Sequence, residues 1–175
     1  MSAPEPSTSR RLGVLMLLGG WLLVTWVLWQ VFDGVLDRQE NPNAQISTAS
    51  KEEELMLKRN RAGHYLTPGI INGEEVRFML DTGATVVSVP AHLASRLALR
   101  GGASSRAITA NGTVTVKSTV IRQLQIGPFH FENVPGHLNP GMQDNTILLG
   151  MSVLKHMEFV QRGNTLTLRA APAKR

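Results

Sequence analysis

Residues 76–90 read VRFMLDTGATVVSVP, and this stretch decides the fold. An apolar segment leads directly into Asp81-Thr82-Gly83, and a β-branched segment leaves directly after Ala84. An isolated Asp-x-Gly is most often a polar turn. Apolar residues on both sides instead predict that Asp81 is largely buried, and a buried carboxylate needs a partner or a changed protonation state. The stretch therefore favours a carboxylate with a chemical role over a simple turn.

Short strands separated by turn residues extend on both sides of this stretch. Asn72-Gly73, Asn111-Gly112 and Gly163-Asn164 are typical hairpin turns, and Gly127-Pro128 marks a further turn. The predicted strands cover residues 65–71, 76–80, 85–89, 107–110, 113–121, 124–126, 130–134, 147–149, 158–160 and 165–169. Short helices are predicted at 90–97 and 150–154. Residues 59–170 are thus expected to form a mainly β domain with one or two short helices, and residues 171–175 a tail.

The N-terminal part contains a predicted membrane span. Residues 12–32 carry no charge over 21 positions, which is enough for a helix to cross a bilayer of about 30 Å. A cleaved signal peptide would have a shorter apolar region followed by small residues, whereas this run ends in Trp29-Gln30-Val31-Phe32-Asp33. A buried core helix is a third possibility, but the apolar composition on all sides argues against it. Arg10 and Arg11 place residues 1–11 in the cytoplasm and the rest of the chain outside.

Charge is distributed unevenly after the span. Residues 33–58 carry three Lys or Arg and six Asp or Glu, a net of −3, and are predicted to form an acidic linker. Residues 51–58 within it could form a short helix. Residues 59–175 carry thirteen Lys or Arg and six Asp or Glu, a net of +7. These basic residues are scattered singly, without interleaved aromatic residues, so nucleic-acid binding is not expected.

No residue pattern predicts a metal site or a cofactor. The chain has no cysteine, which excludes disulfides, zinc–thiolate sites and a cysteine nucleophile. Its five histidines form no HxH, HxxxH or HExxH spacing. We therefore expect neither a metal ion nor a cofactor to take part in the chemistry.

Three motifs together resemble the retropepsin, or retroviral-type, family of aspartic peptidases, in particular its small bacterial membrane-anchored members. Leu80-Asp81-Thr82-Gly83-Ala84 resembles the family's catalytic motif, and Leu148-Leu149-Gly150 resembles its element of two apolar residues and a glycine. Thr109-Ala110-Asn111-Gly112 stands where the family carries its flap hairpin. The resemblance covers roughly residues 60–170. It implies a retropepsin-like acid-protease half-barrel, preceded by a single transmembrane helix.

The resemblance also implies the chemistry, with Asp81 as the catalytic carboxylate. Two such carboxylates would share one proton and activate a water, without a covalent intermediate or a cofactor. The apolar strand 147–149 would pack behind the motif loop. The residues expected to support the motif are Thr82, Gly83, Ala84, Leu148, Leu149 and Gly150. Those expected to form a mobile flap tip over a protein or peptide substrate are Ala110, Asn111 and Gly112.

A single Asp-Thr-Gly cannot supply two catalytic carboxylates. The only other aspartate of residues 59–175 is Asp144, and Asp144-Asn145-Thr146 is more typical of a polar turn. The second carboxylate is therefore expected from another copy in a two-fold homodimer. An anchor through residues 12–32 would favour pairing, because it confines the copies to one bilayer.

The expected function is a membrane-anchored aspartic endopeptidase. The resemblance places it in a bacterial inner membrane, as a single-pass protein with the catalytic domain in the periplasm. One alternative is a non-catalytic peptide-binding or scaffolding module that holds an extended peptide in the same cleft. Another is a membrane-tethered structural protein in which Asp81 is only a turn residue. The intact Asp-Thr-Gly favours the enzyme.

Overall fold

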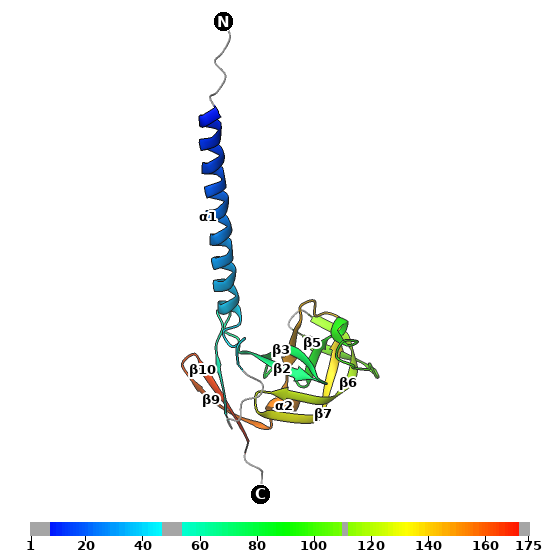
Figure 1. The fold of residues 1–175 in the computed structure, drawn as a ribbon. Coiled ribbons are helices and arrows are strands. Elements are labelled where there is room, and N and C mark those ends of the chain that lie inside the picture. The colour runs from blue at the N-terminus through cyan, green and yellow to red at the C-terminus, as the bar shows by residue number, and fades with distance from the viewer. Residues whose placement is uncertain (1–7, 47–53, 110–111, 172–175) are drawn as a thin grey trace. The chain divides into compact units, whose positions relative to one another are not determined.

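The computed structural model describes residues 8–46, 54–109 and 112–171. They form two units, Met1–Gln39 and Glu40–Arg175. The first unit is helical. The second is mainly β, with ten strands and two short helical elements within its described residues (Figure 1). The mainly β expectation is confirmed.

The first unit consists of helix α1, Thr8–Glu40 (Figure 1). Its segment Leu12–Glu40 is long and apolar enough to cross a bilayer, with a mean hydropathy of 2.0. Large apolar side chains are exposed along it, including Trp21 at 64% and Trp29 at 68%. The predicted span ended at residue 32, but the helix continues without a break through residues 33–40. By length and composition, α1 is a candidate membrane span.

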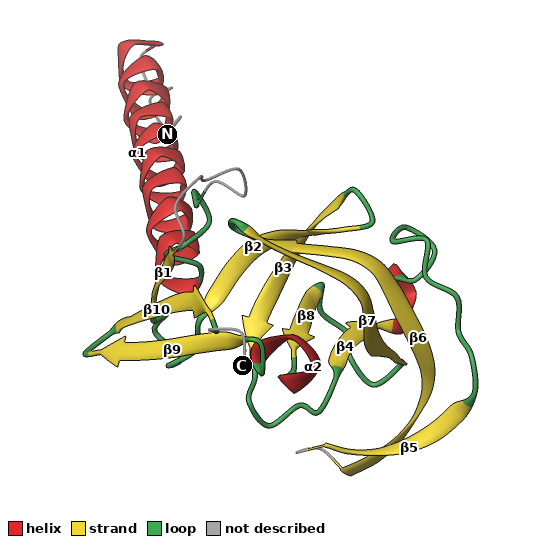
Figure 2. Ribbon diagram, turned by 90° about the horizontal axis from the view of Figure 1, so that it is seen from below, coloured by secondary structure: helices red, strands yellow, loops and turns green. Residues whose placement is uncertain are grey.

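The larger sheet of the second unit has seven strands. They are β2 Leu66–Ile71, β3 Glu74–Leu80, β4 Val87–Pro90, β5 Ser104–Thr109, β6 Gly112–Ile126, β7 Phe129–Asn139 and β8 Thr146–Leu149. Their order is β2-β3-β8-β4-β7-β6-β5, and a further pairing of β2 with β6 curls the sheet back on itself (Figure 2). Strand β6 runs through both of the strands predicted at 113–121 and 124–126, so no turn separates them.

A second sheet has three strands in the order β1-β10-β9. Their bounds are Glu54–Lys58 for β1, Thr165–Ala170 for β10 and Met157–Arg162 for β9. The short helix predicted at residues 51–58 is therefore wrong over β1. Leu55 and Leu57 are buried while Met56 between them is exposed, which is the two-residue period of a strand. Burial of these two leucines outweighs the helix preference of the charged residues around them.

The helical elements of this unit are shorter than predicted. The helix expected at 90–97 is a 3₁₀ turn, η1 Ala91–Leu93, followed by non-helical turns. Its chain bends back so that the backbone N–H of Leu99 donates to the carbonyl of Ala94 at 2.9 Å, which buries Leu97 completely. The second helix, α2 Met151–Leu154, lies inside the region predicted for it.

The hydrophobic core lies between the two sheets and the short helical elements. Phe78 of β3, Val87 of β4 and Ile147 and Leu149 of β8 are fully buried in it. Leu57 and Leu168 extend the same core into the three-stranded sheet. The strands that carry the Asp-Thr-Gly loop thus have a rigid apolar base.

The segment 41–46, predicted as part of the acidic linker 33–58, is fixed to the domain through Asn43. The side chain of Asn43 is 3% exposed. Its Nδ2 donates to the carbonyls of Lys58 and Leu66 at 2.8 Å each, and its Oδ1 accepts from the N–H of Lys58 at 2.8 Å. We call Asn43 with these three hydrogen bonds the Asn43 clamp. Ile46 also packs against the core.

Removing the clamp should destabilise the domain. In Asn43→Ala, the Lys58 N–H and the Lys58 and Leu66 carbonyls lose their partner in a buried setting. We expect the free energy of unfolding to fall by about 1–3 kcal/mol. Denaturant unfolding of the full chain in detergent measures the difference. The matched control is Asn41→Ala, since Asn41 Oδ1 has no hydrogen-bond partner. A loss in the control as large as in Asn43→Ala would contradict the assignment.

Candidate active site

Strand β8 places the Asp-Thr-Gly loop by lying between β3 and β4 (Figure 2). It pairs in parallel with β3, with Phe78 opposite Ile147 and Leu80 opposite Leu149. On its other side Leu148 lies opposite Ser88 of β4. The loop that joins β3 to β4 therefore crosses over the end of β8. Asp81 and the Leu148-Leu149-Gly150 element, far apart in sequence, meet at this point.

Backbone hydrogen bonds hold Asp81 in this loop. Its N–H donates to the Leu149 carbonyl at 3.1 Å, and its own carbonyl accepts from the Ala84 N–H at 3.2 Å. Its carboxylate Oδ1 accepts from the Gly83 N–H at 2.9 Å. That last bond orients the carboxylate within the loop.

Gly150 allows α2 to begin directly against the motif loop. The N–H of Met151 donates to the Ala84 carbonyl at 2.8 Å, and the N–H of Ser152 donates to the Thr85 carbonyl at 3.0 Å. A Cβ on Gly150 would lie 2.6 Å from the Ala84 carbonyl oxygen and closer still to that of Val86. Only a residue without a side chain leaves room for this contact.

Ser152 is a supporting residue that the sequence motifs did not indicate. Its Oγ accepts from the Val87 N–H and donates to the Pro135 carbonyl, both at 3.2 Å. The hydroxyl thereby ties α2 to β4 and β7. In the sequence, the position of Ser152 two residues after Gly150 could have indicated this supporting role.

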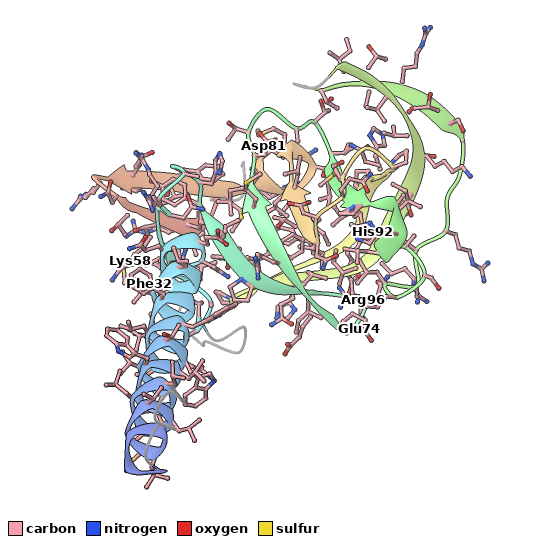
Figure 3. All side chains as sticks on the ribbon, turned by 90° about the horizontal axis from the view of Figure 1, so that it is seen from above. Phe32, Lys58, Glu74, Asp81, His92 and Arg96 are labelled. Atoms are coloured by element: carbon pink, nitrogen blue, oxygen red, sulfur yellow. The ribbon has the colours of Figure 1, made fainter. Side chains whose placement is uncertain are left out.

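The motif loop is more exposed than the sequence predicted. Asp81 and Ala84 are half-buried in the single chain, and Thr82 and Gly83 are exposed. The expectation of a largely buried Asp81 is therefore wrong for one copy. The alternation of β3 turns Phe78 inward, but Asp81 follows the last residue of that strand, where the sheet opens. In Figure 3 Asp81 lies at one end of β3 and Glu74 at the other.

Asp144 does not lie beside Asp81. It precedes β8, whereas Asp81 bonds to Leu149 at the end of that strand, so roughly 16 Å of extended chain separates the two positions. Asp144 instead lines an open hollow of about 1130 Å³ over β2 and β3, together with Arg77 and Met79. Asp81 does not line this hollow. The geometry thus gives Asp144 no part in the motif.

The hairpin of β5 and β6 stands where the flap was predicted. Thr109 pairs with Gly112, and the Thr109 hydroxyl donates to the Gly112 carbonyl at 2.8 Å. Gly112 has a φ of 108°, which favours glycine. The predicted tip residues Ala110 and Asn111 lie outside the described residues. Next to the tip, Ile108 is 91% exposed, unusual for a large apolar side chain.

The described part of the chain holds no group of three or more His, Cys, Asp or Glu side chains suited to a metal ion. The arrangement is instead that of one oriented carboxylate at the open end of a sheet, with a β-hairpin arm in the same domain. Such a carboxylate can act as a base toward a water, provided that an acid stands opposite it.

Comparisons with known proteins agree with this geometry. Residues 67–156 match a family model described as "gag-polyprotein putative aspartyl protease". A crystal structure of a retropepsin-like aspartic protease from Rickettsia conorii superposes with a TM-score of 0.56 at 30% sequence identity, covering 67% of this chain and 90% of that one.

Two curated bacterial proteins are also similar to the chain. An uncharacterized Sinorhizobium protein from the cobV 5' region is 26% identical over 128 residues, 71% of this chain and 55% of that protein. The uncharacterized protein RP867 of Rickettsia prowazekii is 29% identical over 108 residues, 60% of this chain and 46% of that protein. The chain thus spans about half the length of these curated relatives.

Two glycines beside Asp81 should respond differently to an added methyl group. Gly150→Ala forces backbone apart at the Ala84 and Val86 carbonyls, so we expect a loss of about 3 kcal/mol or more in unfolding free energy. In Gly83→Ala the new Cβ meets only the Asp81 Oδ1, at 3.1 Å. That variant should stay folded with a displaced carboxylate. Denaturant unfolding of both variants checks this, and equal losses would contradict it.

Proposed function

Because the chain belongs to the retropepsin-like family of aspartic proteases, we propose that it is a membrane-anchored endopeptidase that hydrolyses peptide bonds in protein substrates at a site shared by two copies. The observation that carries the proposal is Asp81. It stands half-exposed at the open end of β3, with its carboxylate held by the Gly83 N–H. The chain contains one Asp-Thr-Gly, so a complete site needs a second copy.

In the proposed dimer, two Asp81 carboxylates face each other across a two-fold axis. At close range the two carboxylates share one proton. The ionised member takes a proton from a water, which attacks the carbonyl carbon of the scissile peptide bond. The protonated member donates to the carbonyl oxygen. The carboxyl that took the proton from water then gives it to the amide nitrogen, while the other carboxylate takes a hydroxyl proton from the tetrahedral intermediate. The C–N bond breaks, the amine leaves and the dyad again shares one proton.

Exposed groups around the motif support pairing of two copies. Thr82 is exposed beside Asp81, and its hydroxyl is free to reach the loop of a partner. Met151, whose N–H bonds to Ala84, is 37% exposed, and so is Phe159 of the edge strand β9. Exposed apolar side chains of this kind are suited to a protein interface, and Met151 lies next to the motif loop.

The hairpin of β5 and β6 would cover the substrate. Its inner face carries Val114, which lies against Gly141 in the loop before β8. Its tip follows Ile108, whose open side chain would gain a partner when substrate is bound. A hairpin that closes over the cleft would exclude water from the reaction, as the flap residues 110–112 were predicted to do.

We further propose that α1 anchors the enzyme in a bacterial inner membrane with the β domain in the periplasm. The support is the apolar helix itself, the two arginines before the span and the bacterial relatives. In this arrangement the two copies of the chain carry their Asp81 residues on the same side of one bilayer. The anchors raise the chance that two copies meet.

Mixed dimers should reveal the shared site. Asp81→Asn protein should be inactive alone, and equal co-expression with wild type should leave about one quarter of the wild-type activity at equal total protein, since random pairing gives that share of dimers with two Asp81. Cleavage of a denatured protein substrate measures this. Asp144→Asn is the matched control and should leave activity near wild type. Full activity from a demonstrated monomer would contradict the shared site.

The rate of hydrolysis should follow a bell-shaped curve against pH, because one carboxylate must be ionised while the other keeps its proton. Ala84→Ser adds a hydroxyl that can donate to the ionised carboxylate, so its acid limb should lie at lower pH. Measuring kcat/KM across pH for both proteins checks this, with exposed Ala103→Ser as the control. An optimum above about pH 8 would speak against the carboxylate pair, since both members would then be ionised.

Topology is testable with reporter fusions. A reporter that works only outside the cytoplasm should be active when fused after residue 60, and a reporter that works only in the cytoplasm should be silent there. Fusions after residue 9 should give the reverse. A cytoplasmic reporter active after residue 60 would overturn the proposed orientation.

A further inference from the structure

The chain between the membrane span and the β domain is short and structured. The predicted span ends at residue 32, and α1 continues as one helix to Glu40. Eight helical residues rise about 12 Å. Asn41 and Pro42 then lead to Asn43, which the clamp fixes to Lys58 and Leu66. Two extended residues add at most about 7 Å. The first fixed point of the domain is therefore within roughly 20 Å of the end of the span.

Two further contacts fix the same segment. The Asn60 side chain donates to the Glu40 carbonyl at 3.1 Å, so the last residue of α1 is itself bonded to the domain. The backbone turns tightly after it, with the Ala44 N–H donating to the Asn41 carbonyl at 3.2 Å. A free linker over residues 33–58 would have a contour length of about 90 Å. The first fixed point of the domain is thus several times closer to the end of the span than a free linker of 26 residues would allow.

Symmetry adds a second constraint. In a homodimer both anchors must enter the same bilayer in the same direction. A two-fold rotation keeps that direction only if its axis stands roughly along the membrane normal. The two Asp81 carboxylates flank this axis. An extended substrate that contacts both copies alike must cross the axis, so it lies roughly parallel to the bilayer surface.

We propose that residues 33–46 act as a standoff of limited length, which restricts the enzyme to extended substrate segments lying along the bilayer and close to it. This rests on the proposed function. A domain of this size is roughly 35–40 Å across, so the cleft stands no more than about 60 Å above the span. The substrate class is therefore membrane proteins, or proteins held at the membrane, that expose a cleavable segment within this height.

The enzymatic test uses the full chain in vesicles with a single-pass substrate in the same bilayer. Helical spacers hold an identical cleavable segment about 15 Å or about 80 Å above the surface. Wild type should cleave the near site at least tenfold faster than the far site. Insertion of 40 Gly/Ser residues after Glu40 should reduce this ratio to below threefold. A wild-type ratio near one, or a ratio that the insertion does not change, would overturn the proposal.

Asn43→Ala tests whether the clamp sets the length. Without the Asn43 side chain, the segment keeps only the exposed hydrogen bond from Asn60 to the Glu40 carbonyl and the packing of the partly buried Ile46. The near-to-far ratio should fall at least threefold, while Asn41→Ala should keep the wild-type ratio. If the ratio is unchanged in Asn43→Ala but lowered by the insertion, Asn43 does not set the length of the standoff. Cleavage of a soluble denatured protein in detergent should be alike for all variants, and its absence in wild type would count against the proposed function instead.

A measurement that does not depend on catalysis tests separately whether the domain is held close to the membrane. Because the chain has no cysteine, Ala62→Cys in the exposed turn after Asn60 provides one labelling site. Energy transfer from a donor there to acceptor lipids should be strong in the full chain and fall at least twofold after the 40-residue insertion. Equal transfer in both proteins would overturn the standoff, whether or not the enzyme is active.

Discussion

The contact between Gly150 and the backbone of residues 84–86 is the constraint on which the rest of the site depends. Because Gly150 has no Cβ, the carbonyls of Ala84 and Val86 can lie directly over the start of α2. The N–H groups of Met151 and Ser152 then bond to the motif loop, and Leu149 bonds to Asp81. A loop that would otherwise be mobile is thereby fixed by backbone groups, which do not depend on side-chain rotamers.

The residues that support the motif loop are different from the residues that would take part in the chemistry. The buried residues Phe78, Ile147 and Leu149 lie beneath the loop and belong to the hydrophobic core. In the loop itself, Asp81 is half-buried and Thr82 is exposed. One folded copy therefore provides a stable base with an open upper side. Under the proposed dimer, the desolvation that catalysis needs comes from the partner and the substrate, and not from the fold of one chain.

Several features were accessible from the sequence because each depends on local pattern. The apolar strand before Asp81 and the Asn72-Gly73 turn predicted the sheet. The resemblance of Leu148-Leu149-Gly150 to the family's element implied that strand 147–149 packs behind the motif loop. Residues 51–58 misled because their glutamates and lysines favour a helix, whereas tertiary burial of Leu55 and Leu57 selects a strand. The Asn43 clamp joins residues 15 and 23 positions apart through backbone carbonyls. Because every residue has a backbone carbonyl, no pattern of side chains in the sequence predicts these hydrogen bonds.

Exposure of Asp81 was mispredicted for a reason that bears on function. Apolar flanks indicate a buried strand, but they do not say whether the residue after the strand is covered by the same chain or by another. Under the proposed dimer, activity depends on the pairing equilibrium, because a second copy completes the carboxylate pair. For copies confined to a bilayer, that equilibrium is set by their density in the membrane plane and by the freedom of the domains to turn toward each other. The short chain between residue 32 and Asn43 then limits the height above the bilayer at which a paired site could work.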